Sequence, residues 1–397
     1  MTSKLSSLCS YVKDKVAVDT LSTKTYISTE NMVPNKGGIE VASSLPSVQY
    51  TQAYSEGDVL VSNIRPYFKK IWMAEFNGGC SNDVLVFRAN TGCNPVFLYY
   101  VLANDAFFDY ATATSKGTKM PRGDKTAIMQ YDVPDFDYPT QQRISGVLRS
   151  LDGQIATNKK VNDNLQQQAK SLFKKWFIEN PDAALWQEGT FSDLIEKTIS
   201  GDWGKDTPSG NNTELVYCIR GADIPEVRTG NKGKMPTRYI LPKNYASKQL
   251  VNGDIVVEIS GGSPTQSTGR AAAISASLLA RYDKGMVCTN FCKALKPITG
   301  YSMYVYHYWQ YLYDQGVFFS YENGTTGIKN LDISGFLETE PISIAPEKLV
   351  KKFDTFCQAV FSKVYANGLE NEQLALVRDA LLPKLMSGEL DVSGIQL

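Results

Sequence analysis

The sequence contains an internal repeat, which restricts the fold to two similar halves. Gly-Asp pairs followed by an apolar run occur at 57–62 and again at 253–258, 196 residues apart. Gly-Thr pairs at 117–118 and 324–325 are 207 residues apart, and Leu172 and Leu381 are 209 apart. The interval grows slowly along the chain, as small loop insertions between two copies of one unit would produce. We therefore expect a pseudo-two-fold molecule.

Each copy has a strand-rich part followed by a long helix. Short β-type runs separated by glycine, proline and asparagine turns occupy residues 1–138 and 181–345. Helical patterns occupy 139–180 and, with a short tail, 346–397, and a proline stands at the start of each, where it is favoured. The expected fold class is α+β, with two β-rich domains separated by two long helices that form an antiparallel coiled coil.

The apolar residues of both helical parts recur at alternating intervals of four and three, which is a heptad pattern. Asparagines interrupt each pattern near its middle, so antiparallel packing would bring two polar centres together and fix the register. The other interpretation is that each helix packs only on its neighbouring domain. The predicted seam residues are Ile144, Leu148, Leu151, Ile155, Asn158, Leu165, Leu172, Leu349, Phe353, Phe356, Val360, Leu374 and Leu381.

Composition identifies no partner and no catalytic chemistry. Basic and acidic side chains are equal in number, at 41 each, so a nucleic-acid surface requires local segregation of charge. Seven scattered cysteines and the lack of an apolar run of about 18–20 residues favour a cytoplasmic location.

Catalytic motifs are missing from the sequence. It has no Asn-Pro-Pro-Tyr or Asp-Pro-Pro-Tyr box and no G-x-x-x-x-G-K-S/T phosphate loop. The single histidine, His307, lies in an aromatic helix, and Cys288 and Cys292 lack a second ligand pair at zinc spacing. We expect no catalytic residue, no cofactor and no metal, although a hydrolase that uses only carboxylates stays open.

Two longer passages resemble a known family. "YDVPDFDYPTQQRISGVLRSLDGQIATN" (131–158) and "ALLPKLMSGEL" (380–390) are similar to the helical regions of the specificity subunits of type I restriction–modification systems. "KLSSLCSYV" (4–12) and "FSDLIEKTISG" (191–201) resemble the start of their target-recognition domains. The resemblance covers nearly the whole chain, but the second helix begins "PISIAPEKLVKKF" and lacks the Gln-Arg-Ile of the first.

The resemblance implies a non-catalytic DNA-recognition subunit. Each recognition domain would read one half of a bipartite, asymmetric double-stranded target. The helices would set the spacing and dock two methyltransferase subunits, which restriction subunits with translocase and nuclease activity would join. The alternative is a non-catalytic protein with two modules that bind protein or glycan partners.

Local basic segments are the candidate DNA-contacting surfaces. Lysine and arginine would neutralise phosphates, and short polar side chains in the Gly-Thr loops would reach base edges. The other interpretation is a solvated basic face with glycines that only turn the chain. The candidates are Arg65, Tyr67, Lys69, Lys70, Ser115, Lys116, Thr118, Lys119, Arg122, Arg228, Lys232, Lys234, Arg238, Arg270, Asn323, Thr325, Thr326 and Lys329.

Overall fold

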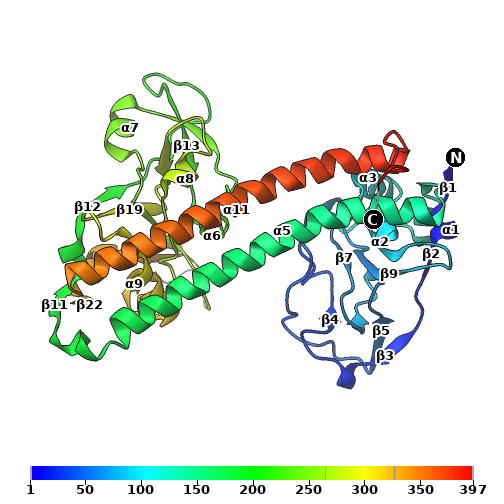
Figure 1. Cartoon of the computed structure of the whole chain (residues 1–397), viewed down its shortest axis with the longest axis horizontal. Coiled ribbons are helices and arrows are strands. Elements are labelled where there is room, and N and C mark those ends of the chain that lie inside the picture. The colour runs from blue at the N-terminus through cyan, green and yellow to red at the C-terminus, as the bar shows by residue number, and fades with distance from the viewer. Residues whose placement is uncertain (1, 264, 325–327, 396–397) are drawn as a thin grey trace. The chain divides into compact units, whose positions relative to one another are not determined.

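The computed structural model describes residues 2–263, 265–324 and 328–395 (Figure 1). By its internal contacts the chain divides into two compact units. Unit 1 comprises Met1–Gly153 and Leu374–Leu397, and unit 2 comprises Gln154–Gln373. The long helices α5 (Tyr138–Phe173) and α11 (Glu347–Ser387) each contribute residues to both units.

Unit 1 is built on two four-stranded sheets. Its strands are β1 (Thr2–Lys4), β2 (Cys9–Tyr11), β3 (Lys15–Ala17), β4 (Tyr26–Ile27), β5 (Tyr50–Tyr54), β6 (Val59–Ser62), β7 (Ile71–Met73), β8 (Gly78–Cys80), β9 (Val84–Ala89) and β10 (Asp132–Pro134). Its short helices are α1 (Leu5–Leu8), α2 (Pro95–Ala103), α3 (Asp105–Ala113) and α4 (Lys125–Ile128). The sheets have the orders β2-β9-β6-β7 and β3-β5-β8-β4, and β1 pairs with β10.

Unit 2 repeats this plan with additions. Its strands are β11 (Gln187–Thr190), β12 (Ile195–Ser200), β13 (Glu214–Ile219), β14 (Thr237–Ile240), β15 (Ile255–Glu258), β16 (Ser260–Gly261), β17 (Ala271–Ala273), β18 (Met286–Cys288), β19 (Cys292–Pro297), β20 (Glu322–Asn323), β21 (Lys329–Leu331) and β22 (Pro341–Ile344). Its helices are α6 (Ile224–Arg228), α7 (Pro242–Lys248), α8 (Ala276–Leu279), α9 (Ser302–Asp314) and α10 (Ile333–Thr339). Its sheets are β12-β19-β15-β17, β14-β13-β18 and β16-β21-β20, and β11 pairs with β22.

The two units share one sheet topology, which confirms the internal repeat. The order β2-β9-β6-β7 in unit 1 matches β12-β19-β15-β17 in unit 2, and every pairing in both sheets is antiparallel. The Gly-Asp turns match as well. Asp58 accepts a hydrogen bond from the backbone three residues earlier and pairs with Arg88 at 2.7 Å. Asp254 makes the same turn and pairs with Lys296 at 2.9 Å.

Each unit has its own hydrophobic core, to which both long helices contribute. In unit 1, Leu148 of α5 and Leu382 of α11 lie in one cluster with the aromatic side chains of α2 and α3. In unit 2, Phe173 of α5 and Phe353 of α11 pack with Trp309 of α9. The helices therefore pack both on the domains and on each other, which combines the two interpretations of the heptad pattern.

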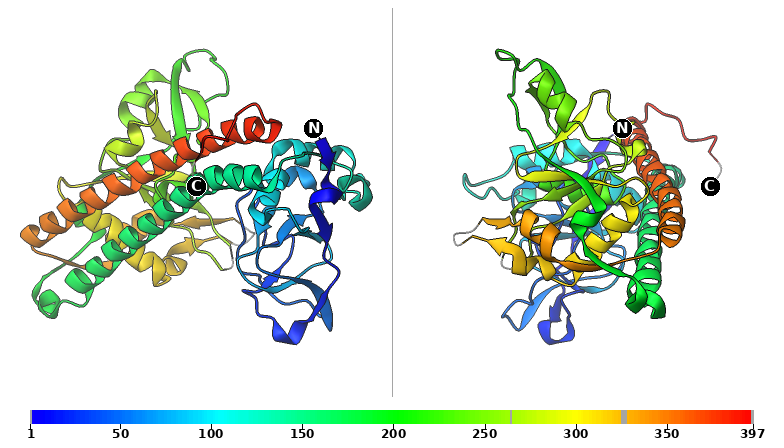
Figure 2. Two further views of the ribbon diagram at one scale, coloured as in Figure 1. Left: turned by 45° about the vertical axis from the view of Figure 1, so that its right-hand side comes forward. Right: turned by 90° about the vertical axis from the view of Figure 1, so that its left-hand side faces the viewer.

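Helices α5 and α11 lie side by side and run antiparallel (Figures 1 and 2), which confirms the expected coiled coil. In unit 2 the asparagines of the two helices meet. Asn158 Nδ2 donates to Asn371 Oδ1 at 3.0 Å, and Asn367 Nδ2 donates to Asn162 Oδ1 at 2.8 Å. All four asparagines are at most 8% exposed, and further bonds from Asn158 to Glu370 and from Asn162 to backbone carbonyls join this buried polar network.

The predicted seam residues differ in burial. The side chains of Ile144, Leu148, Asn158, Phe353 and Val360 are buried. Those of Leu151, Ile155, Leu165, Leu172, Leu349, Phe356, Leu374 and Leu381 are half-buried. In α11 the fully buried positions also include Val350, Cys357 and Val364, which face the core of unit 2.

Replacing Asn162 by leucine tests the asparagine pair. The variant should lose about 1–3 kcal/mol of folding free energy, because it leaves the buried amide of Asn367 without its partner. Asn164→Leu, two residues along the same helix on an exposed side chain, is the control and should change stability by less than about 0.5 kcal/mol. Chemical denaturation measures both, and equal effects would contradict a special role for the pair.

Candidate nucleic-acid interface

Two loops of unit 1 meet beside the sheet β2-β9-β6-β7. They comprise residues 63–70 and 115–123 and together form the loop pair of unit 1. Lys116 and Arg122 exchange two backbone hydrogen bonds of 2.8 and 2.9 Å, which closes the second loop into a hairpin. The Arg65 backbone N–H donates to the carbonyl of Pro121, and Gly123 donates back to Asn63. The structure thus brings together two of the basic segments that the sequence singled out.

Unit 2 has the same arrangement in the described parts of residues 259–270 and 322–331 (259–263, 265–270, 322–324 and 328–331), which form the loop pair of unit 2. Strand β16 of the first loop pairs with β21 of the second, and β21 pairs with β20. The Leu331 N–H donates to the carbonyl of Ile259, as Gly123 donates to Asn63 in unit 1. Thr268 donates its N–H and its hydroxyl to the carboxylate of Glu322, so the two loops are also joined through side chains.

A tight turn adjoins each loop pair, at residues 81–83 and 289–291. Three backbone hydrogen bonds are the same in both units. The backbone N–H of the first turn residue donates to a carbonyl of a neighbouring strand. The N–H of the residue after the turn donates to the carbonyl of the first turn residue. The carbonyl of the third turn residue accepts from an N–H of the loop pair. The third side chain differs: Asp83 accepts from Arg122 at 3.1 Å, whereas Phe291 is 63% exposed. One backbone framework therefore presents different side chains.

Five of the candidate side chains in unit 1 are exposed on or beside its loop pair. They are those of Tyr67, Lys116, Thr118, Lys119 and Arg122, of which Arg122 donates to Asp83. Lys116 is 82% exposed and lies 2.6 Å from Asp124 Oδ2, a contact that raises the pKa of the lysine and leaves it accessible to solvent. A second anion could therefore approach Lys116, and the side chain of Lys119 is open to solvent.

The remaining candidates of unit 1 are held by other parts of the unit. Lys69 lies 3.0 Å from Asp105 Oδ2, and Lys70 Nζ donates to a backbone carbonyl at 2.6 Å. Burial lowers the pKa of Lys70. Ser115 Oγ donates to a carbonyl of the preceding helix at 2.7 Å. Arg65, half-buried, is in the left-handed backbone region with φ 50°.

Three basic candidates in unit 2 are already neutralised. Arg270 makes a two-pronged ion pair with Glu258, at 2.7 and 2.6 Å, and both side chains are largely buried. Lys329 lies 2.7 Å from Glu322, and the Arg238 guanidinium is paired with Asp206. Arg270 and Lys329 hold the loop pair of unit 2 in place, and a phosphate at any of the three cations would have to compete with a carboxylate.

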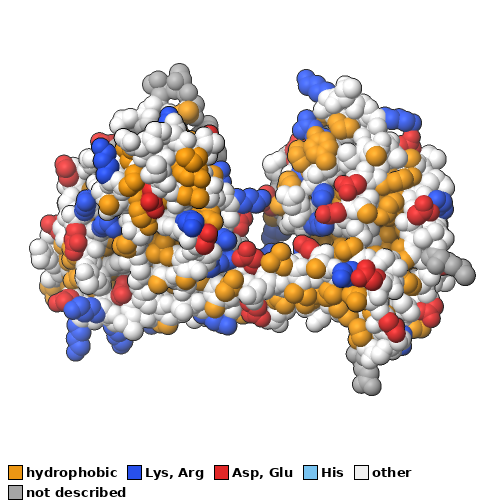
Figure 3. All heavy atoms as spheres, turned by 90° about the horizontal axis from the view of Figure 1, so that it is seen from above, with side chains coloured by type: hydrophobic (Ala, Val, Ile, Leu, Met, Phe, Trp, Pro, Cys, Tyr) orange, Lys and Arg blue, Asp and Glu red, His pale blue; other side chains and the backbone are white. Residues whose placement is uncertain are grey.

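The other candidate residues of unit 2 differ in the burial and the contacts of their side chains. Arg228 is half-buried against Tyr306 of α9, and Lys232 Nζ lies 4.8 Å from the centre of the Tyr282 ring. Lys234 and Asn323 are exposed. Thr325 and Thr326 lie outside the described residues. On the face drawn in Figure 3, lysine and arginine side chains are interspersed with acidic ones rather than merged into one basic field.

The histidine and the cysteines of the chain are buried. His307 is 5% exposed among aromatic rings, and burial lowers its pKa to about 3. All seven cysteines are buried. Within the described parts of the chain, no group of three or more His, Cys, Asp or Glu side chains is placed to hold a metal ion. No described helix is both long and apolar enough to cross a membrane.

The sequence prediction missed the turn at 289–291 and the nearby Trp203. The repeat carried a signal for the turn, because Cys-Ser-Asn-Asp at 80–83 corresponds to Cys-Thr-Asn-Phe at 288–291. It also missed Asn330, which occupies in unit 2 the bridge position that Arg122 occupies in unit 1. Most of these side chains are uncharged, so the local segregation of charge gives no signal for them.

The chain is similar in sequence to two curated proteins over most of its length. It is 26% identical to the MjaIX type I restriction enzyme specificity subunit of Methanocaldococcus jannaschii, covering 75% of this chain and 70% of that one. It is 23% identical to the HindI type I restriction enzyme specificity subunit of Haemophilus influenzae, covering 92% and 94%. No protein-family model matches the chain.

The fold is similar to that of a solved structure. The crystal structure of the type I restriction–modification S subunit from M. genitalium superposes with a TM-score of 0.53 and covers 97% of this chain and 96% of that one, at 15% sequence identity. At this identity the likeness concerns the fold, which agrees with the α+β prediction.

Proposed function

We propose that this chain, whose curated relatives are type I restriction enzyme specificity subunits, is the DNA sequence-specificity subunit of such a complex. One observation carries the proposal: the same loop pair and turn are built twice, on the same sheet topology, with different side chains. A repeated framework with exchanged side chains suits two similar tasks on two different ligands. Each unit would then read one half of a bipartite, asymmetric DNA target.

The different side chains account for an asymmetric target. Arg122 in unit 1 corresponds to Asn330 in unit 2, and Asp83 corresponds to Phe291. Arginine favours guanine and asparagine favours adenine in the major groove, because each makes two hydrogen bonds to the edge of that base. Identical half-sites are therefore not expected from these two surfaces.

Affinity would come from cations that stay accessible. In unit 1 these are Lys116 and Lys119, and in unit 2 Lys234 has an exposed side chain. The paired cations Arg270 and Lys329 would instead stiffen the loops that present polar side chains to the bases. Phosphate contacts position a protein on DNA, and base contacts provide its specificity.

Within the complex we assign recognition to residues 1–138 and 181–345, and spacing and docking to 139–180 and 346–397. The helical parts would bind two methyltransferase subunits, with restriction subunits added to them. The chain itself would supply no catalytic group and no cofactor, in keeping with its buried histidine and cysteines. The complex would act in the cytoplasm.

The test is to map methylated adenines in the source genome with and without this chain. A split motif should disappear when the chain is deleted, and coexpression with the methyltransferase of the same genome should restore it. Replacing 187–344 by the matching part of a relative should change one half of the motif and leave the other. If no motif depends on the chain, it is better explained as a two-module protein that binds protein or glycan.

Replacing Lys116 and Lys119 together by alanine should weaken binding of the assembled methyltransferase complex to its target. Losing two phosphate contacts should also reduce the slope of log affinity against log salt by about 1.8. Lys4→Ala is a matched control, because Lys4 is also an exposed lysine paired with an aspartate of unit 1. Binding titrations at several salt concentrations measure both. An unchanged slope would exclude the two lysines as phosphate contacts.

A further inference from the structure

An open pocket of about 460 Å³ lies beside the loop pair of unit 2. Its aromatic side chains are Trp203, from the loop after β12, and Phe291, from the turn before β19. Ser260 of β16 also lines it, so the pocket is continuous with the loop pair. Its volume is in the range of pockets that bind one small planar molecule.

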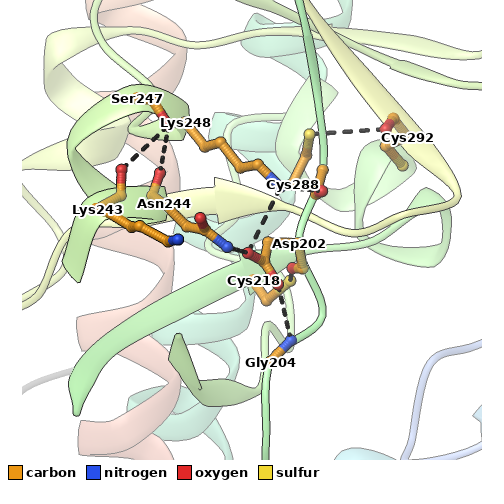
Figure 4. A network of polar contacts seen from close by, with 10 residues as sticks. Asp202, Gly204, Cys218, Lys243, Asn244, Ser247, Lys248, Cys288 and Cys292 are labelled. Carbon is orange, nitrogen blue, oxygen red and sulfur yellow. Dashed lines mark hydrogen bonds and ion pairs between the residues drawn. The ribbon is translucent and has the colours of Figure 1, made fainter. Parts of the chain in front are cut away.

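The loop that carries Trp203 is held in a fixed position (Figure 4). Asp202 accepts hydrogen bonds from Asn244 at 2.6 Å and from the N–H of Gly204 at 3.1 Å. Its carbonyl accepts from the Cys218 thiol at 3.2 Å. The Arg238 guanidinium lies 3.7 Å from the centre of the Trp203 ring. These contacts hold the ring as a platform beside the pocket.

The two aromatic walls are also tied to each other. The Asp202 N–H donates to the carbonyl of Cys288 at 2.8 Å. A Cβ atom at Gly201 would stand 1.9 Å from the carbonyl oxygen of Thr289, so the loop can approach the turn this closely only with glycine. The turn that carries Phe291 thus packs directly on the loop that carries Trp203.

The polar groups of the pocket are neutral as a set. Arg220 is paired with Asp223 at 2.8 and 3.0 Å, and Arg270 is paired with Glu258. Neither arginine is therefore free to hold an anion in the pocket. Thr289 is 2% exposed and lines the pocket. Its hydroxyl is enclosed by protein and lies next to the thiol of Cys292.

We propose that this pocket receives one unstacked nucleobase of the DNA bound by unit 2, an inference that rests on the proposed function. A nucleobase is planar, uncharged and able to hydrogen-bond at its edge, which matches two aromatic walls, balanced charges and the polar side chains of Ser260 and Asn290 in the lining. A phosphate would find the cations of the pocket already paired with carboxylates.

Unit 1 provides an internal comparison. The residue equivalent to Phe291 is Asp83, which is bound to Arg122 and would offer a carboxylate instead of a ring. The turn at 81–83 adjoins a polar hollow lined by serines and by Glu30 and Glu40. Base capture is therefore expected only in the half-site read by unit 2.

The experiment uses the methyltransferase complex and a duplex that carries the motif mapped as above. Each nucleotide of the half-site read by unit 2 is replaced in turn by an abasic site, and binding is measured for the parent chain, Phe291→Ala and Phe291→Asp. The second variant inserts the residue of unit 1. Because Phe291 is mostly exposed, both variants should fold.

With intact DNA, the two variants should bind about 5- to 150-fold more weakly, as expected for the loss of one base–aromatic stack. At one abasic position the variants and the parent should bind alike, because the stacking partner is missing. The adenine that the methyltransferase itself extrudes should show no such coupling to Phe291.

Three results would overturn the inference. Equal weakening at every position, or none, would show that Phe291 contacts no captured base. Loss of assembly with the methyltransferase in the absence of DNA would make the pocket a protein-binding surface. If instead no motif depends on the chain, the proposed function fails first and base capture fails with it.

Discussion

Gly368→Ala is expected to destabilise unit 2 by about 2–4 kcal/mol, although alanine is the better helix former. A Cβ atom at 368 in α11 would stand 1.9 Å from the carbonyl oxygen of Gly230, a backbone atom that cannot rotate away. The segment around Gly230 would have to move and lose its hydrogen bond from Arg281, now 2.7 Å long. Overpacking of about 1–3 kcal/mol and a lost charged bond of about 1.5–3 kcal/mol outweigh the gain of about 1 kcal/mol in propensity.

The control is Gly153→Ala, at a glycine inside the other long helix. A Cβ atom there would meet nothing within 4 Å, so the substitution should stabilise the chain by about 0.5–1 kcal/mol. Two identical changes in two helices should thus have opposite signs. Chemical denaturation followed by tryptophan fluorescence suits the test, because four of the five tryptophans lie in unit 2. A Gly368→Ala chain as stable as the parent would show that the contact is loose.

The contact at Gly368 fixes a basic segment to which the proposed function assigns DNA contacts. Asn162 donates to the carbonyl of Thr229, and Gly230 itself has a φ of +87° and lies against Val364. The lysines that follow, Lys232 and Lys234, begin from this anchored point. Under the proposed function, replacing Gly368 should therefore also weaken DNA binding.

The architecture could be predicted because it depends on patterns that repeat along the chain. The matched Gly-Asp turns and the heptads, with asparagines at their centres, predicted two related units and an antiparallel helix pair. What periodicity could not show is how many partners one helix has. Val350 and Cys357 of α11 are fully buried in unit 2, whereas the neighbouring Leu349 and Phe356 are half-buried, because a domain and a second helix both pack against α11.

The candidate site was predictable in place but not in detail. Charge and turn residues singled out segments that the structure brings together in each unit, since these segments had matching positions in the repeat. Whether a cation is available depends on its partner, and partners are distant in sequence: Arg270 is neutralised by Glu258, and Arg238 is neutralised by Asp206. Phe291 carries no charge, so charge patterning could not identify it as a candidate. Its place in the site follows only from the correspondence between its turn and the turn that carries Asp83.

Lengthening both long helices by one heptad is expected to change the spacing of the DNA target. The insertions belong after Gly153 in α5 and after Gln373 in α11, where the division between the units falls, so that both cores stay intact. Seven helical residues add about 10.5 Å to the length of a helix. They rotate the following residues about the helix axis by two full turns less about 20°. On B-DNA this rise corresponds to about three base pairs.

The gap is the stretch of DNA between the two half-sites of the target. We expect it to lengthen by about one to three base pairs. The upper value applies if only the distance between half-sites matters, and smaller values apply because each added base pair also rotates DNA by about 34°. Mapping methylated motifs in cells that carry the lengthened chain measures the gap directly. The half-site sequences should stay unchanged, because neither loop pair is altered.

Insertion into α5 alone is the matched control for this experiment. It would displace one helix against the other by about 10.5 Å on one side of the insertion. That displacement would separate Asp152 from Arg378 in unit 1, or the asparagine pairs in unit 2. The single insertion should therefore prevent assembly, whereas the double insertion should not. A double insertion that methylates the original motif with its original gap would show that the helices dock partners without setting the spacing.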